Sequence, residues 1–258
     1  MRRLLNFYTL VLLGFLYLPI AVIVALSFNK SRFGARWTGF TLHWYEKLFS
    51  NHRVLEYAWN SLFVAVVSTL IATVLGTLLA VGLWRYRFRL KNALRFLLYV
   101  PVVVPDIVMG VSLLLFFAWW RQKTGLFHLS LTTIILGHVT FQIAYVALLV
   151  KSRLAALDPG LEEAAADLGA RGLATFRHVT FPLVWPGILA GALLAFSLSL
   201  DDFVITFFTA GPGSTTLPLY IFASVKRGVT PEIHALSAIL IAATTAAMIV
   251  GRALMQRR

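Results

Sequence analysis

The 258-residue sequence contains no cysteine, few charged residues and no nucleotide-binding motif. The lack of cysteine excludes a disulfide framework and any metal site built from thiolates. The six histidines include no pair at H-x-x-x-H spacing, so a zinc site is not expected. No G-x-x-x-x-G-K-[ST] segment occurs, so the chain carries no P-loop for ATP. We therefore expect no cofactor in this chain.

Apolar side chains dominate what is present. Hydrophobic residues make up 59% of the sequence and charged residues 13%, and the mean hydropathy is +0.82. These values are typical of a protein that resides in a lipid bilayer. The net charge of +13 comes from short basic runs between apolar segments rather than from a continuous basic stripe. A nucleic-acid partner is therefore not expected.

Six segments are long and apolar enough to cross a bilayer, which takes about 20 residues. They cover residues 8–28, 59–84, 96–120, 131–150, 186–209 and 233–251. We therefore predict an all-α integral membrane protein with a single membrane domain over residues 1–258. The first segment is longer than the apolar region of a typical signal peptide, so we expect it to be a retained signal anchor.

Lysine and arginine residues predict the orientation, because cytoplasmic loops carry more of them than outer loops do. The densest cluster lies in the connection 85–95, with Arg85, Arg87, Arg89, Lys91 and Arg95. If this connection is cytoplasmic, so are both termini and the segment 158–182. The loops 29–58 and 210–232 then lie outside, and apolar residues at helical spacing in the first loop predict an amphipathic helix.

Three acidic residues fall inside the predicted spans, namely Asp106, Asp201 and Asp202. A charged side chain at the centre of a bilayer costs about 2.5–3.5 kcal/mol or more, which marks each acid as a candidate functional residue. No lysine or arginine lies in the interior of a span. The acids therefore require a partner on another chain, a bound cation, or a proton.

The positions of the three acids suggest different roles. Adjacent helical residues point about 100° apart, so Asp201 and Asp202 are not expected to face one pore together. One of them is expected to face a substrate pathway and the other a neighbouring helix. Asp106 follows Pro101 and Pro105, and it could instead cap a helix at the break that these prolines make.

Aromatic side chains could bind an ammonium group by cation–π contacts. The main candidates are Phe141, Tyr145 and Tyr220, with Trp119, Trp120, Phe203 and Phe207 as further ones. Most aromatic residues on such spans pack against helices or lipid. His138 and Gln142 could likewise line a cavity or bridge two helices.

The segment 158–182 is a mostly polar stretch between two apolar runs. Asp158-Pro159 is a typical helix start, and Glu162 and Glu163 would lie in the first turn, where the helix dipole favours negative charge. Gly169 can take the left-handed conformation that ends a helix. A second short helix over residues 173–180 is expected to end before Pro182 and Pro186.

This segment reads E-A-A-x3-G-x9-V-x-F-P from Glu163 to Pro182, and it resembles the cytoplasmic "EAA loop" of ABC importer permeases. Val179 and Phe181 stand where that family usually has isoleucine and leucine, which are also apolar. The resemblance assigns coupling to an ATPase to residues Glu162, Glu163, Ala164, Ala165, Gly169, Phe176 and Pro182.

Further runs resemble the spermidine/putrescine branch of these permeases. They include residues 60–62, 101–110, 197–204, 211–213, 216–218 and 228–233. The resemblance implies the six-span type I (MetI-like) importer fold in a bacterial inner membrane. It also implies a second homologous permease, an ATPase homodimer that binds ATP and Mg²⁺, and a periplasmic solute-binding protein.

Other functions remain open from the sequence. The same architecture could carry another amine, a GABA-like compound or an opine. An anionic solute is less favoured, because the spans offer no basic residue along a pathway. A proton-coupled transporter or an intramembrane enzyme could use the three acids as a relay, but the E-A-A segment would then have no explanation.

Overall fold

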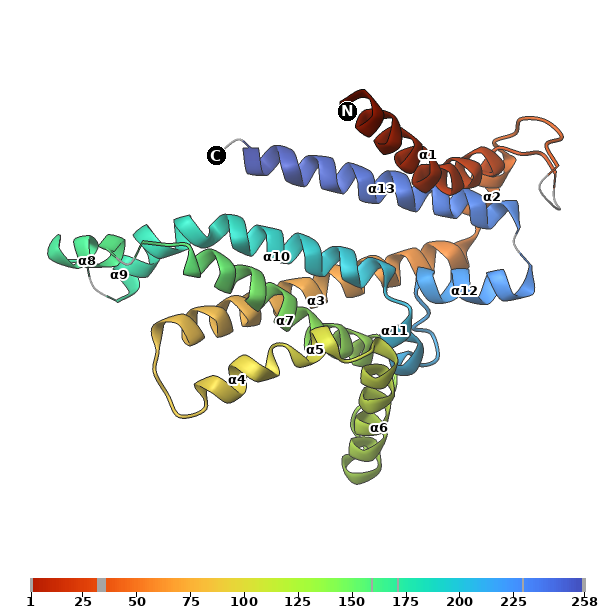
Figure 1. Ribbon diagram of the computed structural model, residues 1–258. Coiled ribbons are helices and arrows are strands. Elements are labelled where there is room, and N and C mark those ends of the chain that lie inside the picture. Colours follow the sequence, from red (N-terminus) through yellow and green to blue (C-terminus); the bar gives the residue numbers. More distant parts are fainter. Residues whose placement is uncertain (1, 32–35, 159, 171, 229, 257–258) are drawn as a thin grey trace. The chain divides into compact units, whose positions relative to one another are not determined.

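The computed structural model describes residues 2–31, 36–158, 160–170, 172–228 and 230–256, and the described part is helical without a named β-strand (Figure 1). Pro159, which the sequence predicts as part of a helix start, lies outside the described residues. The chain divides into two compact units. The first unit combines Met1–Glu56 with Tyr220–Arg258, and the second is Tyr57–Leu219.

The helices and short turns are α1 (Arg2–Ser27), α2 (His43–Ser50), α3 (His52–Arg85), α4 (Lys91–Leu97), α5 (Val100–Val103), α6 (Asp106–Thr124), α7 (Leu131–Ala155), α8 (Gly160–Asp167), α9 (Leu173–Thr175), η1 (Phe176–Thr180), α10 (Phe181–Asp201), α11 (Val204–Thr209), α12 (Leu217–Arg227) and α13 (Pro231–Gln256).

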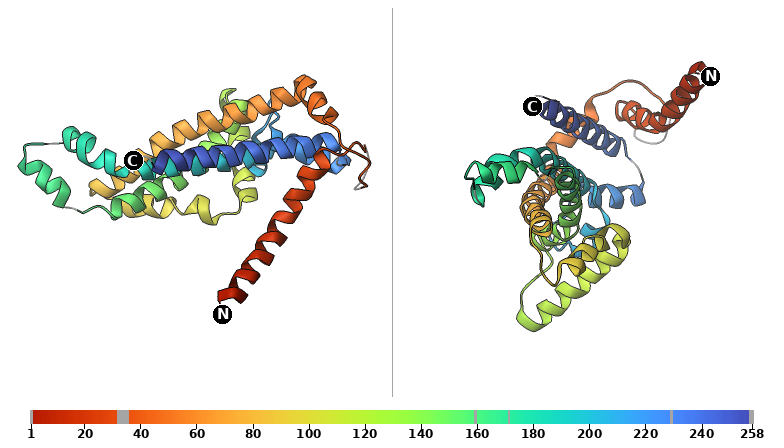
Figure 2. Two further views of the ribbon diagram at one scale, coloured as in Figure 1. Left: turned by 90° about the horizontal axis from the view of Figure 1, so that it is seen from above. Right: turned by 60° about the vertical axis from the view of Figure 1, so that its left-hand side comes forward.

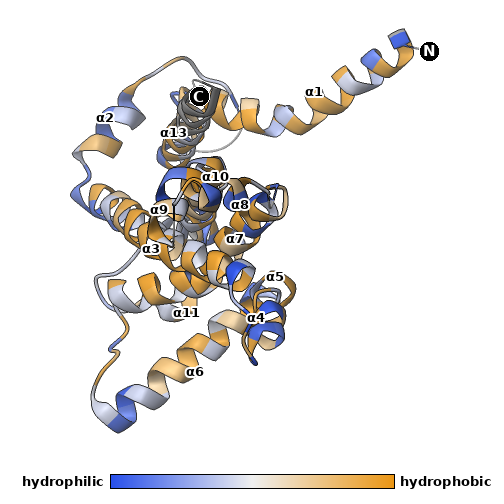
Figure 3. Ribbon diagram, turned by 90° about the vertical axis from the view of Figure 1, so that its left-hand side faces the viewer, coloured by the Kyte–Doolittle hydropathy of each residue, from blue (hydrophilic) through white to orange (hydrophobic). Residues whose placement is uncertain are grey.

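Apolar helix surfaces are exposed along much of the chain. Figure 3 shows α1 and α6 with apolar residues around most of their circumference, and α1 keeps none of its most apolar stretch buried. In water this exposure would be costly, whereas lipid tails solvate such side chains and the helical backbone satisfies its own hydrogen bonds. Four helices in the described part are long and apolar enough to cross a membrane, or five if one bent pair counts as a span.

In the first unit, α1 and α13 meet near the end of α1 and diverge towards the N-terminus (Figure 2). The short helix α2, which the sequence predicts as amphipathic, buries Trp44 and Leu48. The indole of Trp44 donates to the Asn29 carbonyl at 2.8 Å. Lys47 forms a salt bridge of 3.0 Å with Glu232 at the start of α13. These contacts fix α2 against α13 within this unit.

In the second unit, α3 and α10 both pack against α7. Val146 of α7 is fully buried, and glycines on both neighbouring helices face it. A Cβ atom added to Gly76 would lie 2.8 Å from the Val146 Cβ, and one added to Gly191 would lie 3.2 Å from the Val146 Cα. Small residues let helix backbones approach closely, which is how helices associate where lipid replaces water.

Polar side chains tie the connection between α11 and α12 to α3. Asn60 donates to the Thr215 carbonyl at 3.0 Å, and the Ser61 hydroxyl accepts from the Leu217 amide at 2.8 Å. Residues 211–214 form a turn, with the Ser214 amide donating to the Gly211 carbonyl. Buried backbone groups in this connection thereby obtain hydrogen-bond partners.

Two of the predicted spans are broken rather than continuous. The stretch 96–120 bends by 111° between α5 and α6, because Pro105 has no amide proton and pushes Val104 into an extended conformation. The stretch 186–209 stops at Asp201 and resumes at Val204. Hydropathy alone predicted one helix in each place, since neither break interrupts the apolar composition.

The prediction that Pro182 and Pro186 end the short helix over 173–180 is wrong. Residues 173–201 run without interruption, with Pro182 in the first turn of α10 and Pro186 inside it. The preceding turn over Phe176–Thr180 is a wide π-turn, in which the Phe181 amide donates to the Phe176 carbonyl. We attribute the continuity to this wider turn, which gives the proline ring room beside the preceding carbonyls.

Candidate functional site

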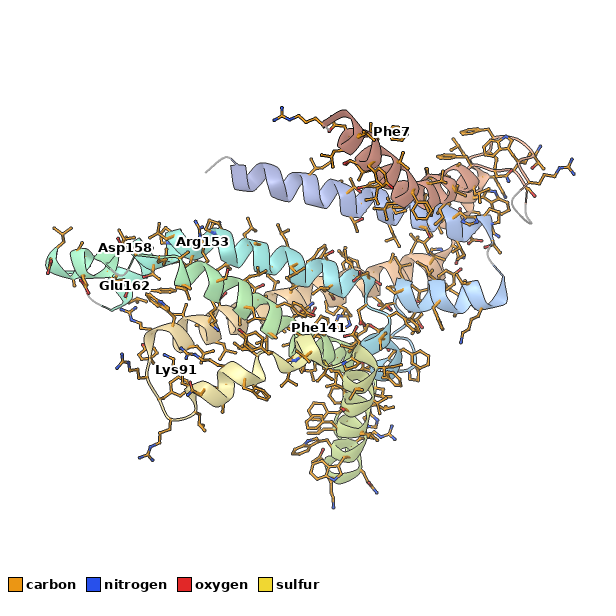
Figure 4. All side chains as sticks on the ribbon, in the orientation of Figure 1. Phe7, Lys91, Phe141, Arg153, Asp158 and Glu162 are labelled. Carbon is orange, nitrogen blue, oxygen red and sulfur yellow. The ribbon has the colours of Figure 1, made fainter. Side chains whose placement is uncertain are left out.

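A cavity of about 280 Å³ lies in the second unit where both helix breaks come together. It is lined by Pro101, Asp106, Phe141, Tyr145, Leu198, Asp201, Asp202, Phe203, Val204 and Ile205. These residues come from α5, α6, α7, α10 and α11, and Figure 4 labels Phe141 in the middle of α7. Irregular backbone is tolerated at membrane depth where it lines a cavity, so the breaks and the cavity belong together.

The cavity gathers five of the six residues that the sequence nominated for a substrate pathway. All three acids line it, together with Phe141 and Tyr145. The expectation that Asp201 and Asp202 do not face one pore together is not met in this cavity, because α10 ends at Asp201 and the Asp202 backbone is extended. Tyr220 lies on α12 and is not part of the lining. Of the further aromatic candidates only Phe203 contributes, because Trp119 and Trp120 lie towards the other end of α6.

The two neighbouring aspartates have different surroundings. The Asp202 carboxylate accepts from the amides of Ile205 and Thr206 at 3.3 and 2.8 Å, so it caps the first turn of α11. It also accepts from the Thr206 hydroxyl at 2.8 Å. The Asp201 side chain is exposed, and no described residue forms a salt bridge with it.

Asp106 is the first residue of α6, directly after the Pro105 break. Its carboxylate lies at a helix N-terminus, where the dipole favours a negative charge. No described residue forms a salt bridge with it either. The cavity therefore presents two carboxylates, Asp106 and Asp201, without a cationic partner in the described part of the chain.

His138 and Gln142 bridge helices and are absent from the cavity lining. The His138 ring is 1% exposed and contacts Ser199 through Nδ1 at 2.7 Å and Asp202 through Nε2 at 3.2 Å. Gln142 Nε2 donates to the Ala195 carbonyl at 2.9 Å. Ser199 could not be predicted as a partner of His138, because a serine in an apolar helix has no distinguishing spacing.

The segment 158–182 begins with the predicted cap. Asp158 Oδ1 accepts from the Gly160 amide at 2.9 Å, and Figure 4 shows Asp158 and Glu162 at the α8 end of the unit. Gly169 has φ of +86°, as predicted for a helix end. The Ala170 amide donates to the Ala165 carbonyl and the Gly169 amide to the Ala166 carbonyl, which is the Schellman pattern.

The predicted coupling residues divide into inward-facing and outward-facing ones. Glu162 bonds to the Thr180 hydroxyl and lies 3.9 Å from Arg85, which ties α8 to η1 and α3. Ala165 is buried and Phe176 is partly buried. Exposed side chains on the same segment include those of Glu163, Ala164, Leu168, Leu173 and Pro182, with Leu168 89% and Leu173 78% exposed.

Solved structures show which fold the chain has. The fold matches a chain of a bacterial ABC transporter involved in import of the acidic polysaccharide alginate, with a TM-score of 0.76, 15% identity, and coverage of 99% of this chain and 96% of that one. It also matches the MetNI methionine ABC transporter with a TM-score of 0.64, 18% identity, and coverage of 79% and 94%. The fold is that of a type I ABC importer permease, as predicted.

Sequence comparison identifies the family. Residues 72–257 match the family described as binding-protein-dependent transport system inner membrane component, and the chain belongs to this family. The spermidine/putrescine transport system permease protein PotC of Haemophilus influenzae is 41% identical over 247 residues, covering 96% of this chain and 94% of the relative. The putrescine transport system permease protein PotI of Escherichia coli K12 is 44% identical over 243 residues, covering 91% and 85%.

Family membership confirms that the chain is a permease subunit of an ABC importer and a transport component rather than an enzyme. In such systems a separate ATPase handles the nucleotide. The cavity is accordingly a candidate for a stage in solute passage, and the segment 158–182 is a candidate for contact with the ATPase.

Proposed function

We propose that this permease imports polyamines such as spermidine or putrescine. The observation that carries the proposal is a cavity at the breaks of two apolar helices, with two carboxylates that form no salt bridge with a described residue and a third carboxylate beside them. The printed names of the relatives at 41% and 44% identity support the same cargo class.

The cavity chemistry suits a flexible polycation. Asp106 and Asp201 offer negative charge to ammonium groups, and Phe141, Tyr145 and Phe203 offer ring faces and edges beside an alkyl chain. Since the lining formed by described residues contains no lysine or arginine, an anionic solute would find no complementary charge.

Orientation follows from charge and from one contact. Arg85 begins the basic connection 85–95 and lies 3.9 Å from Glu162 of α8, so the basic connection and the segment 158–182 lie at the same end of the second unit. We place this end in the cytoplasm of a bacterial cell, because positive charge is retained there. We infer that both termini are cytoplasmic on the same grounds.

We assign the exposed face of the segment 158–182 to the ATPase. Glu163, Ala164, Leu168 and Leu173 present one charge and several apolar groups to a partner surface. An ATPase homodimer, a second homologous permease and a periplasmic solute-binding protein complete the proposed importer, with ATP and Mg²⁺ bound by the ATPase.

Coupling can pass along α10. Glu162 holds α8 to Thr180 directly before α10, and Asp201 is the last residue of that helix. With 21 residues at 1.5 Å each, α10 spans about 30 Å from the coupling segment to the cavity. Movement of α8 on the ATPase would therefore move the cavity wall, as alternating access requires.

Two other functions remain to be separated by experiment. Another amine, a GABA-like compound or an opine could be the cargo of the same architecture. A proton-coupled mechanism would need no ATPase.

The test is uptake by proteoliposomes containing the whole importer and its binding protein. We expect ATP-dependent uptake of labelled spermidine or putrescine, with competition by the other polyamine and none by GABA. Uptake of an unrelated solute alone would refute the polyamine assignment, and polyamine uptake without ATP would refute the coupling mechanism.

A further inference from the structure

Buried polar side chains form a chain of contacts that ends at Asp202 in the cavity lining. Ser68 Oγ lies 3.4 Å from Ser199 Oγ, which lies 2.7 Å from His138 Nδ1. His138 Nε2 in turn lies 3.2 Å from Asp202 Oδ2 and 3.1 Å from Thr206 Oγ1. All these side chains except that of Asp202 are 5% exposed or less. They join α3, α7, α10 and α11 at one point.

The directions of these hydrogen bonds follow from the acceptor at the end of the chain. A carboxylate oxygen can only accept, so Nε2 of His138 carries a proton towards Asp202. In the neutral ring Nδ1 then accepts from the Ser199 hydroxyl. A buried polar group that loses its partner costs about 1–3 kcal/mol, so the members of this network hold one another in place.

The network acts on only one of the two aspartates. His138, the Thr206 hydroxyl and two backbone amides consume the accepting capacity of Asp202 and hold it as the cap of α11. Asp201, one residue earlier on α10, lies outside the network and faces the cavity.

We propose that His138 is a positioning residue that holds Asp202 in the wall between α10 and α11, which leaves the charge of Asp201 available to the cargo. Asp202 then sets the break in the helix, and Asp201 sets the preference for cationic charge. The assignment of cargo in this statement rests on the proposed function, whereas the positioning of Asp202 does not. His138 itself is no cargo ligand, because it is buried and absent from the cavity lining.

The first test measures positioning without transport. Hydrogen exchange of the purified importer reports on the Ile205 and Thr206 amides, which donate to Asp202. His138→Leu removes the donor to Asp202, and we expect exchange at these amides to become about tenfold faster or more. His138→Gln keeps a donor near the Nε2 position, and we expect exchange within about threefold of wild type.

Gln142→Leu is the matched control for this measurement. Gln142 lies one turn further along α7, is fully buried and bonds to the Ala195 carbonyl rather than to Asp202. We expect it to leave exchange in α11 unchanged. Should His138→Leu fail to assemble, Ser199→Ala removes the bond to Nδ1 and is expected to accelerate the same amides. Unchanged exchange at Thr206 in an assembled His138→Leu or Ser199→Ala importer would overturn the positioning role.

The second test uses cargo charge. Spermidine is a triamine and putrescine a diamine, so a lost cargo-binding carboxylate should reduce uptake of spermidine more. We expect Asp201→Asn to lower the spermidine-to-putrescine ratio of saturating uptake rates by about threefold or more. His138→Leu should lower the spermidine and putrescine uptake rates by a common factor. Because His138 acts through Asp202, the double variant His138→Leu with Asp202→Asn should transport no more slowly than the slower of the two single variants.

The uptake measurements can overturn the positioning role of His138 in two ways. If His138→Leu shifts the spermidine-to-putrescine ratio of uptake rates as much as Asp201→Asn does, His138 selects cargo and the proposal is overturned. Full additivity of the losses in uptake rate caused by His138→Leu and Asp202→Asn would overturn it as well. If the wild-type importer transports neither polyamine, the proposed cargo is wrong, and the exchange measurement still tests the positioning of Asp202.

Discussion

Replacing Gly76 with alanine tests the close packing of α3 against α7. The added Cβ would lie 2.8 Å from the Val146 Cβ, 2.9 Å from its Cγ1 and 3.0 Å from the Ile143 carbonyl oxygen. Comfortable carbon–carbon contact needs about 3.5–4.0 Å, so α3 must move away by about 1 Å. Overpacking of this kind costs about 1–3 kcal/mol. Because one contact is with a backbone atom, a change of rotamer cannot relieve it.

Gly82→Ala is the matched control, since Gly82 lies on the same helix with nothing within 4 Å of an added Cβ. Glycine to alanine in a helix interior normally stabilises by about 1 kcal/mol, and this gain is common to both variants. The free energy of unfolding in detergent, measured by denaturant titration, should therefore be lower for Gly76→Ala than for Gly82→Ala by about 1–3 kcal/mol. Equal stabilities, or a more stable Gly76→Ala variant, would refute the packing described for α3 and α7.

Three further predictions concern single side chains. Glu163→Lys should leave the permease inserted but abolish stimulation of ATPase activity by loaded binding protein, because Glu163 is exposed on α8; retained stimulation would remove it from the coupling surface. Asp158→Ala should destabilise α8 by about 1 kcal/mol and speed amide exchange there several-fold, because it removes the acceptor for the Gly160 amide; unchanged exchange would contradict the cap. Trp44→Phe should lower the free energy of unfolding by about 1 kcal/mol, since the Asn29 carbonyl loses its indole donor, and no loss in a denaturant titration would show that this bond contributes nothing.

Local chemistry could be predicted from the sequence because it depends on neighbours in the chain. Asp158 caps α8 and Gly169 takes a positive φ, since both roles follow from residue type and position alone. The fold class followed from apolar length, because a bilayer-spanning segment needs a long run of apolar residues. The acids of the cavity were found for a related reason, since a carboxylate in an apolar run is costly in a membrane and therefore marks a candidate functional residue.

The prolines before Asp106 indicated the first helix break, but the break at Asp202 and the buried network could not be predicted in the same way. Asp202 in an apolar run was recognised as a charge, but its role as the cap of α11 depends on Thr206 lying in place to bond it. The contact of His138 with Ser199 joins residues 61 positions apart, and helical periodicity carries no information about such pairs. The turn through Phe176–Thr180 was also missed, because proline signals normally end a helix and a wide turn overrides them.

The placement of Ala165 shows a further limit. The run of three alanines predicts a surface of minimal bulk, but periodicity did not determine which alanine faces outward. Ala165 is buried and Ala164 is exposed. A crosslinking probe directed at the ATPase therefore belongs at residue 164.

The most direct test of the central claim is to identify where the cargo touches this chain. A photoreactive polyamine would be crosslinked to the assembled importer during ATP turnover, and the modified peptides identified by mass spectrometry. We expect adducts within the stretches 101–106, 141–145 and 198–205, which contain the residues that line the cavity, and we expect Asp201→Asn to weaken them. Adducts confined to other parts of the chain, while the polyamine is still imported, would contradict passage through this cavity.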